Sequence, residues 1–330
     1  MKKGAIFLAK KFIRAILLVA GVSAVTFFLV SHSPIDPLQA NVGQAALGTM
    51  SEEQIAQLQE YWGVDTPALS RFLHWAGDFF RGNMGVSLLY RQEVSKVIGE
   101  KLSNSLLLMV TAWVISGVLG FVLGAVAGAH AGKWPDRLIR GYAVFMASTP
   151  AYWVALLLLL IFGVWLGIFP VGFGVPIGVT SEEVTFLQRL HHAVLPALAL
   201  SITGTSSVIL HTREKMAEVM ESEYVLYAKT RGERGARLIL RHGVRNILIP
   251  AVTLQFASVG EIFGGSVLIE QVFSYPGLGQ AAVSAGLGSD IPLLMAITVI
   301  SALLIFAGNL VANMLYGVID PRMRRGGGRE

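Results

Sequence analysis

Glu261 is the residue whose chemical type and position most need an explanation, because it lies inside a long apolar stretch of the 330-residue chain. A carboxylate in hydrocarbon is costly, so such a residue faces a partner group, a proton or a water-filled path. Glu261 therefore either lines a path or forms a structural hydrogen bond, to Gln255 or to another subunit. Asn309 and Asn313 share one face of the last apolar stretch and allow the same two interpretations, pore lining or hydrogen bonds between helices.

Known catalytic and cofactor motifs do not accompany these residues. The chain contains no Cys, which excludes disulfides, thiolate ligands and cysteine nucleophiles, and neither HExxH nor GxSxG occurs. Gly277–Ala282 matches the dinucleotide pattern GxGxxA but follows an apolar helix, and Gly128–Trp134 lacks two residues of a phosphate loop. His191 and His192 have no nearby carboxylate, which disfavours a metal site. We therefore expect neither ATP hydrolysis nor a cofactor in this chain.

The elements that must position Glu261 are membrane spans. With 54% hydrophobic and 14% charged residues and a mean hydropathy of +0.62, the chain is too apolar for an ordinary soluble protein. A spanning helix needs about 20 mostly apolar residues. Six stretches meet this requirement: Phe12–Ser31, Leu106–Ala129, Gly141–Phe169, Ala193–Leu210, Ile247–Ile269 and Ile291–Ile319. We predict an all-α polytopic membrane protein with six transmembrane helices.

The distribution of basic residues predicts how these spans are oriented. Most of the 26 Lys and Arg residues lie in the N-terminal tail, in the second and fourth connections, and after the last span. Both termini are therefore expected in the cytoplasm, and the net charge of +5 reflects membrane topology rather than nucleic-acid binding. The first apolar stretch is longer than the core of a signal peptide, so we expect it to be retained as a helix.

Four parts make up the predicted chain: a tail with the first span (1–31), an external subdomain (32–105), a five-helix core (106–319) and a basic tail (320–330). In the external subdomain, Ser51 and Gln54 predict a capping box. Thr66 and Pro67 predict the N-cap and first residue of a second short amphipathic helix. Docking of an external partner and packing on lipid explain these two helices equally well.

Glycines recur four residues apart on two of the predicted spans. Such spacing lets helices approach closely. Static helix packing is the preferred interpretation, with a sliding surface as the alternative. The glycines are Gly120, Gly124, Gly128 and Gly132 at the second span, and Gly260 and Gly264 at the fifth.

The fourth connection, His211 to Asn246, carries the most local information. Ser222 is predicted to cap a short helix that has Glu223 near its start, Lys229 near its end and Gly232 just beyond. Charge then matches the helix dipole at both ends. Arginines follow at spacings of three, four and four, and predict a basic stripe on the next helix that contacts lipid phosphates. They are Arg234, Arg237, Arg241 and Arg245.

Several motifs in this region and elsewhere resemble those of bacterial ABC importer permeases, most closely the first-permease type of the peptide/nickel branch. They are Tyr224–Gly232, Arg241–Asn246 with Ile247–Pro250, Ser33–Pro37, Val272–Gly279 and Asp320–Arg322. The chain departs from the general importer signature at one point. Leu226-Tyr227-Ala228 stands where that signature has Glu-Ala-Ala, so only Ala228 and Gly232 match it.

The resemblance implies that the segment from about Ser222 to Arg231 is a cytoplasmic coupling helix that binds a separate ATPase. The residues implied in coupling are Glu223, Tyr224, Tyr227, Ala228, Arg231 and Gly232. The implied partners are a second homologous permease in a heterodimer, two ABC ATPase subunits that bind ATP and Mg²⁺, an extracytoplasmic solute-binding protein, and the lipids of the bacterial inner membrane.

The expected function is therefore transport by alternating access, with Glu261 and Asn309 as candidate residues of the route. Glu261 suits either nickel, free or chelated, or the amino terminus of a di- or oligopeptide, and the sequence leaves this choice open. The alternatives are a membrane enzyme that uses Glu261 as a buried acid and, third, an interaction scaffold.

Overall fold

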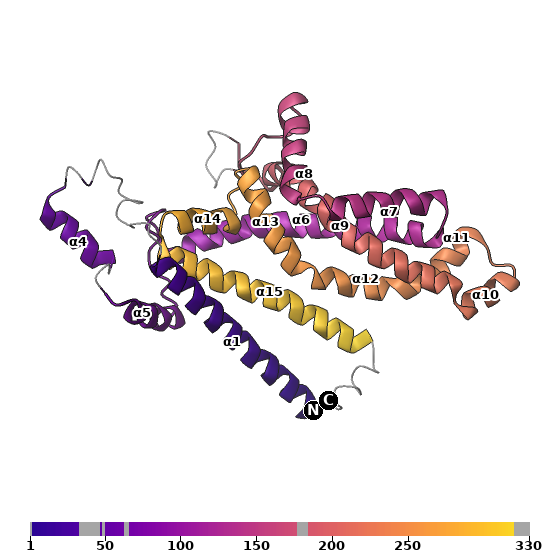
Figure 1. Cartoon of the computed structure of the whole chain (residues 1–330), viewed down its shortest axis with the longest axis horizontal. Coiled ribbons are helices and arrows are strands. Elements are labelled where there is room, and N and C mark those ends of the chain that lie inside the picture. Colours follow the sequence, from indigo (N-terminus) through magenta and orange to yellow (C-terminus); the bar gives the residue numbers. More distant parts are fainter. Residues whose placement is uncertain (1, 33–46, 48–49, 63–65, 177–183, 320–330) are drawn as a thin grey trace. The chain divides into compact units, whose positions relative to one another are not determined.

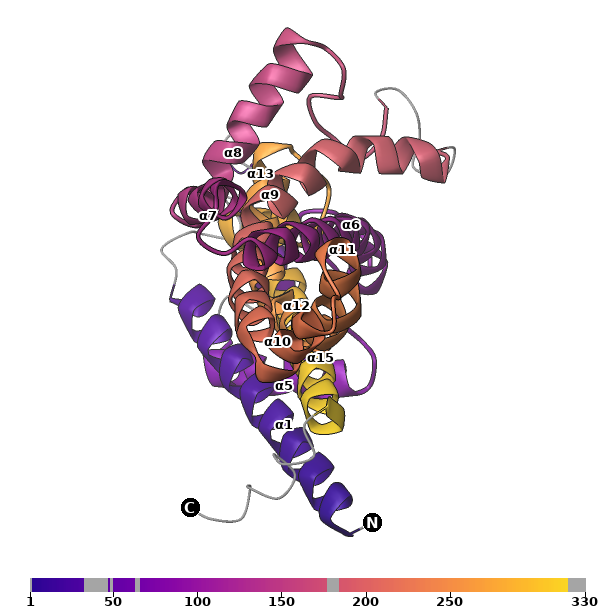
Figure 2. The same cartoon turned by 90° about the vertical axis from the view of Figure 1, so that its right-hand side faces the viewer.

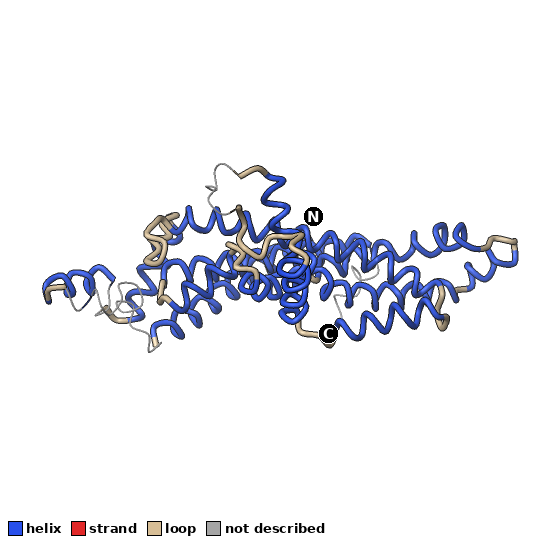
Figure 3. Tube along the Cα trace, turned by 90° about the horizontal axis from the view of Figure 1, so that it is seen from above, coloured by secondary structure: helices blue, strands red, loops and turns tan. Residues whose placement is uncertain are grey.

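The computed structural model describes residues 2–32, 47, 50–62, 66–176 and 184–319. Within these ranges the chain is helical and forms no strand, apart from an isolated bridge between Val86 and Glu93 (Figures 1 and 3). The all-α prediction is confirmed. The motifs Ser33–Pro37 and Asp320–Arg322, with the basic tail, lie outside the described residues.

Long apolar helices dominate the described part of the chain. Four are long and apolar enough to cross a membrane, or six if each of two bent pairs counts as one span. The six-span arrangement is compatible with this finding and stays a prediction. The helices are α1 (Lys2–Ser31), α4 (Glu52–Trp62), α5 (Ala68–Phe80), α6 (Val94–Ala129), α7 (Trp134–Ala147), α8 (Ala151–Leu158) with η1 (Leu159–Trp165), α9 (Phe186–Glu221), α10 (Glu223–Thr230), α11 (Gly235–Leu238) with η2 (Ile239–Val244), α12 (Arg245–Ala257), α13 (Val259–Val272), α14 (Leu278–Leu287) and α15 (Ile291–Ile319).

The helices form two compact units. The first comprises Met1–Asn104 with Pro276–Phe306. Apolar side chains from the start of α6, from α14 and from the start of α15 build its core. The buried Asp290 carboxylate begins α15: it accepts from the Ser87 hydroxyl at 2.5 Å and from the Leu293 amide at 3.2 Å. An acid at this place satisfies backbone donors that a helix start leaves open.

The two short helices predicted in the external subdomain are present in the first unit. The capping box is confirmed, since the Ser51 and Gln54 side chains accept from each other's amides at 3.3 and 3.0 Å. The N-cap prediction for Thr66 is wrong: Pro67 takes that position and α5 begins at Ala68. The fixed φ of proline suits the extended N-cap backbone, here −52° with ψ 134°.

The second unit comprises Ser105–Tyr275 with Ala307–Glu330, and α9 is its central helix, packed by α7, α8, α12 and α13. The glycine face of α6 lies directly against α9. A Cβ added at Gly124 would lie 2.7 Å from the Ile209 carbonyl oxygen and from Thr212 Cβ. Gly120 and Gly128 meet α9 equally closely, so their predicted packing role is confirmed. Gly132 instead occupies a turn with φ +77°.

Two predicted spans are broken. The third, predicted as one helix over Gly141–Phe169, consists of α7 and α8–η1, which meet at 103° (Figures 1 and 2). Pro150 explains the break between α7 and α8, because proline disfavours helical backbone in the residue before it. The fifth bends by 49° between α12 and α13 at Ser258, whose hydroxyl donates to the Gln255 carbonyl at 2.8 Å. Local hydroxyl–backbone bonds of this kind bend helices.

Candidate functional site

Helix α10 is a short helix with a well-formed C-terminus. Gly232, at φ +89°, donates from its amide to the Lys229 carbonyl at 3.0 Å, and the Glu233 amide donates to the Ala228 carbonyl at 3.1 Å. This pair of bonds is the Schellman arrangement, which needs a residue in the left-handed region at the position of Gly232. The sequence prediction that Gly232 ends the helix is confirmed.

The start of α10 differs from the prediction in one detail. Ser222 stands at the N-cap with extended backbone, but its side chain does not cap the helix. Its hydroxyl donates instead to the Val219 carbonyl at 2.5 Å. The reason is that Ser222 is at once the C-cap of α9 and the N-cap of α10. Its side chain satisfies a carbonyl of the helix before it.

One face of α10 is buried and the other is exposed. Val225 and Ala228 pack on Leu238 of α11 and on the end of α9. Tyr224 and Tyr227 are 47% and 64% exposed. The other exposed side chains of this helix and its end are Glu223, Leu226, Lys229, Thr230 and Arg231. Of the residues implied in ATPase coupling, Ala228 lies on the buried face of α10. Exposed positions are occupied by Glu223, Tyr224, Tyr227 and Arg231, and this surface carries two aromatic rings.

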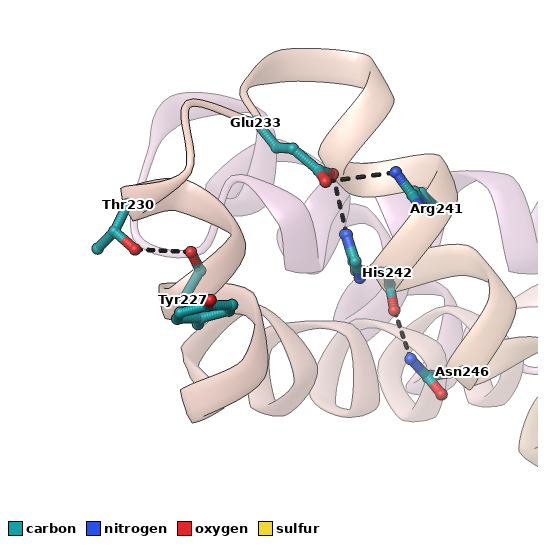
Figure 4. Close-up of polar contacts among 6 residues, drawn as sticks. All are labelled: Tyr227, Thr230, Glu233, Arg241, His242 and Asn246. Carbon is teal, nitrogen blue, oxygen red and sulfur yellow. Dashed lines mark hydrogen bonds and ion pairs between the residues drawn. The ribbon is translucent and has the colours of Figure 1, made fainter.

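A carboxylate directly after α10 ties the helix to the next element (Figure 4). Glu233 accepts from Arg241 at 3.3 Å and lies 2.9 Å from His242 Nε2, both on η2. The hydrogen bond with His242, with the positive charge of Arg241, lowers the pKa of Glu233. These contacts hold the turn at Gly232 against η2, and no local sequence pattern predicted them.

Further contacts join α10 to its surroundings. Asn246 donates to the Tyr224 hydroxyl at 3.3 Å and to the His242 carbonyl at 2.6 Å, while Lys229 donates to the Met220 carbonyl at 3.2 Å. Figure 1 shows α10 and α11 together at one end of α9 and α12. These contacts join α10 to the end of α9 and, through η2, to α12.

The predicted arginine stripe needs a correction. Arg234 precedes α11 rather than lying on the helix, and the π-helical segment η2 replaces α-helical geometry over Ile239–Val244. All four arginines are exposed, but the wider turn of a π-helix breaks the regular spacing of one stripe. Close contact of Gly243 with the Met216 side chain marks the place where η2 approaches α9.

An ion pair that no sequence motif predicted joins α7 to α9. Arg213 donates from Nε to Asp136 Oδ1 at 2.9 Å and from its terminal nitrogen to Oδ2 at 2.7 Å. The Gly132 amide donates to the same carboxylate at 2.8 Å. Asp136 precedes the apolar stretch that starts at Gly141, and Arg213 follows the one that ends at Leu210. These donors, Arg213 foremost, lower the pKa of Asp136 to about 2.

Glu261 lies in the first turn of α13 with its side chain exposed, and among the described residues no hydrogen bond or ion pair to it is formed. The interpretation of Gln255 as its structural partner is wrong. Gln255 donates instead to the Trp113 carbonyl at 2.7 Å and to the Ser116 hydroxyl at 3.1 Å. Asn309 of α15 is exposed too.

A second acid at the end of this span was missed as a candidate. Glu270 lies one residue beyond the predicted end of the fifth span, is fully buried, and accepts from the Ser105 hydroxyl at 2.7 Å. Burial and the bond to α6 make it a packing residue. Within the described ranges, the acidic and histidine side chains form no group of three or more that could hold a metal.

Comparison with known proteins agrees with this architecture. Residues 120–325 match the family described as the binding-protein-dependent transport system inner membrane component. Residues 5–107 match its N-terminal companion, the binding-protein-dependent transport system membrane component. The chain belongs to this family. It is thus a permease subunit of an ABC importer of the peptide/nickel kind, a multi-pass inner-membrane protein and not an enzyme. ATP hydrolysis is carried out by separate ATPase subunits, so the alternative of a membrane enzyme is wrong.

Three curated relatives are similar over nearly their whole length. The oligopeptide transport system permease protein of Bacillus subtilis is 29% identical over 97% of this chain and 99% of its own. The metal-staphylopine import system permease protein of Staphylococcus aureus is 30% identical, over 97% and 98%. The glutathione transport system permease protein of Escherichia coli is 30% identical, over 92% and 94%.

Proposed function

We propose that α10 is the coupling helix through which a partner ATPase moves this permease, and that the exposed surface around Tyr224 and Tyr227 is its contact. The observation that carries the proposal is the form of the helix. It is short, it is seated on a buried base of Val225 and Ala228, and its exposed face carries two tyrosines. Exposed aromatic side chains beside polar ones are typical of protein contact surfaces.

The orientation proposed from the basic residues places α10, with both termini, in the cytoplasm, where ATP is available. In this arrangement six spans cross the membrane, and residues 32–105 form an external subdomain that meets the solute-binding protein. Two ATPase subunits bind ATP and Mg²⁺, and this chain holds no cofactor. A second homologous permease completes a heterodimer in the lipid bilayer.

Movement of α10 would act on the membrane helices through defined contacts. Glu233, with Arg241 and His242, links the end of α10 to η2 and hence to α12. The start of α10 is continuous with α9, which the ion pair to Asp136 joins to α7. ATPase closure would thus displace α9 and α12 together. A partner drives such a change only by binding one of the two packings more tightly than the other.

The proposed cargo is a small peptide or a metal chelate. Relatives of this chain are named for oligopeptide, glutathione and metal-staphylopine import, and we extend that range of cargo to this protein. Glu261 and Asn309, both exposed on predicted membrane helices, are the proposed residues of the transport route.

The test of the coupling role uses Gly232→Val in the assembled transporter. A β-branched residue at φ +89° is strained by about 1–2 kcal/mol, which lowers the population of the intact helix end about tenfold. ATPase recovered with the affinity-purified permease should fall by a similar factor, and uptake with it, while membrane insertion is unchanged. Deletion of residues 222–232 should abolish ATPase recovery.

Gly82→Val is the matched control, because Gly82 has φ +86° and open space around it but follows α5 in the other unit. This variant should carry the same backbone strain and recover normal amounts of ATPase. If Gly232→Val also recovers normal amounts and supports normal uptake, α10 is not the coupling element.

A further inference from the structure

Helix α13 has one buried face and one exposed face. Its buried side chains pack toward α8 and α9, whereas side chains on the opposite face are exposed. The buried residues include Ile262, Ser266 and Ile269. The exposed residues recur at spacings of three and four, so they lie on one side of the helix: Glu261, Gly264, Leu268 and Gln271.

The part of α6 that belongs to the second unit, from Ser105 to Ala129, offers a comparison. Its exposed side chains are all apolar, among them Val110, Val114, Val118 and Val122. Lipid chains can cover such a surface without leaving a polar group unsatisfied. The exposed face of α13 differs because Glu261 places a carboxylate within the predicted fifth span, where lipid offers no hydrogen-bond donor.

The open space at Gly264 and the bend at Ser258 also distinguish the exposed face of α13 from that of α6. A Cβ added at Gly264 would meet nothing within 4 Å, so the glycine is not required by packing inside the chain. Glu261 stands three residues after the bend of 49° at Ser258, near the middle of the predicted fifth span. Bent and interrupted helices at that depth are characteristic of segments that line a cavity or hold a transported ligand.

We propose that the exposed face of α13 lines a water-filled part of the transport route, and that Glu261 binds the ammonium group of the cargo as it passes. This proposal rests on the transport function proposed above and names the chemistry that one side chain contributes to it. A carboxylate has the charge and the acceptor oxygens to pair with one ammonium group, which has three donors. A divalent metal ion normally takes several ligands, so a lone carboxylate suits it less well.

Thiol labelling tests whether the face is in contact with water, and the natural absence of Cys removes any background. Gly264→Cys and Leu268→Cys are introduced singly into the full transporter and treated with a membrane-impermeant, negatively charged methanethiosulfonate. Both should react. Val110→Cys, exposed on the apolar face of α6, is the matched control and should not react. If the two α13 cysteines are as unreactive as Val110→Cys, the face is covered by lipid or by the second permease and the proposal is wrong.

The electrostatic role of Glu261 is measured on the Gly264→Cys background, since Gly264 lies on the same face. The ratio of labelling rates for a positively charged and a negatively charged methanethiosulfonate should fall about fivefold in Glu261→Gln, because the carboxylate attracts the cation. An unchanged ratio would overturn the proposal. Normal recovery of the ATPase in these variants shows that assembly is intact, so a failure here is distinct from failure of the coupling role.

Cargo recognition is tested by protection of the same cysteine. Trialanine with a free amino terminus, supplied with the binding protein, should slow labelling of Gly264→Cys, and Glu261→Gln should remove most of that protection. If nickel ions protect and trialanine does not, or if protection by trialanine is the same with Gln at this position, the ammonium assignment is wrong.

Discussion

Gly124 in α6 and Gly232 after α10 are both glycines at the surface of a helix in the second unit, but each is needed for a different physical reason. Gly124 is needed for space, because any side chain there would collide with the α9 backbone. Gly232 has open space around it and is needed for its backbone conformation. The first belongs to a tightly packed framework and the second to a helix end that stands free.

The regions around α9 and around α10 therefore differ in how a substitution affects them. Around α9, contacts are buried and include a two-pronged ion pair. Around α10, most polar contacts are partly exposed and bridge short distances along the chain. We therefore expect substitutions in the framework to change stability, and substitutions around α10 to change coupling while stability is kept.

The largest effect is expected for Gly124→Val. Forcing a side chain into the α6–α9 contact, where Cβ alone would lie 2.7 Å from the Ile209 carbonyl, should lower the free energy of unfolding by about 3 kcal/mol. Thermal unfolding of the purified protein in detergent, followed by circular dichroism, measures the shift. Gly99→Val in the same helix has no neighbour within 4 Å and should change stability by less than about 0.5 kcal/mol. Equal shifts in the two variants would contradict close packing.

A smaller loss is expected for Asp136→Asn, which removes the charged acceptor for Arg213 and the Gly132 amide. We expect about 2 kcal/mol, since hydrogen bonds to charged groups contribute about 1.5–3 kcal/mol each and Arg213 is partly exposed to water. The control is Glu218→Gln, which breaks an exposed pair with Lys215 and should cost less than about 0.5 kcal/mol.

The same ion pair predicts a pH dependence. The pKa of Asp136 is lowered from its ordinary 3.8 to about 2 in the folded protein. The folded state therefore binds the proton less readily than the unfolded state, and the stability gained from the carboxylate is fully present above pH 3.8. It is lost as the pH falls from about 4 to about 2. The wild type should lose its advantage over Asp136→Asn in this window, and a constant difference in unfolding temperature across it would contradict the assignment.

Local sequence signals predicted the features that depend on a few adjacent residues. The all-helical class follows from the length of the apolar stretches, and the capping box follows from the pair Ser51 and Gln54. The end of α10 follows from a glycine at position 232, which can adopt positive φ. Ser222 failed as a cap because one residue joins two helices, and a pattern that considers a single helix does not register this competition.

Contacts between distant segments could not be predicted. Asp136 and Arg213 are separated by 77 residues, and each by itself reads as an ordinary charge beside a membrane span. Likewise, the spacing of Gly264 matches that of the α6 glycines, but only the fold shows that the α6 glycines meet a neighbouring helix and that Gly264 has open space around it. The apolar stretch Gly141–Phe169 is long enough for one span although Pro150 divides it. Apolar composition does not show that the helix axis changes direction at this proline.

In the α10 region, Glu233→Gln should reduce uptake about twofold while the unfolding temperature stays unchanged, since pairs of this exposure contribute little to stability. The substitution removes the charge that draws Arg241 and His242 to the end of α10. Uptake and ATPase recovery are measured together, with Glu214→Gln, an exposed acid of α9, as the control. A fall in the unfolding temperature as large as that of Asp136→Asn would remove the distinction between the two regions.

The smallest effect is expected for Tyr224→Phe, which keeps the exposed ring and removes only the hydroxyl that accepts from Asn246 at 3.3 Å. If the ring is what the ATPase contacts, recovery of the ATPase should change by less than about twofold, because one partly exposed hydrogen bond contributes about 0.5 kcal/mol. Tyr224→Ala removes the ring as well and should lower recovery further. A loss in Tyr224→Phe as large as that in Tyr224→Ala would mean that the hydroxyl, and not the aromatic surface, makes the contact.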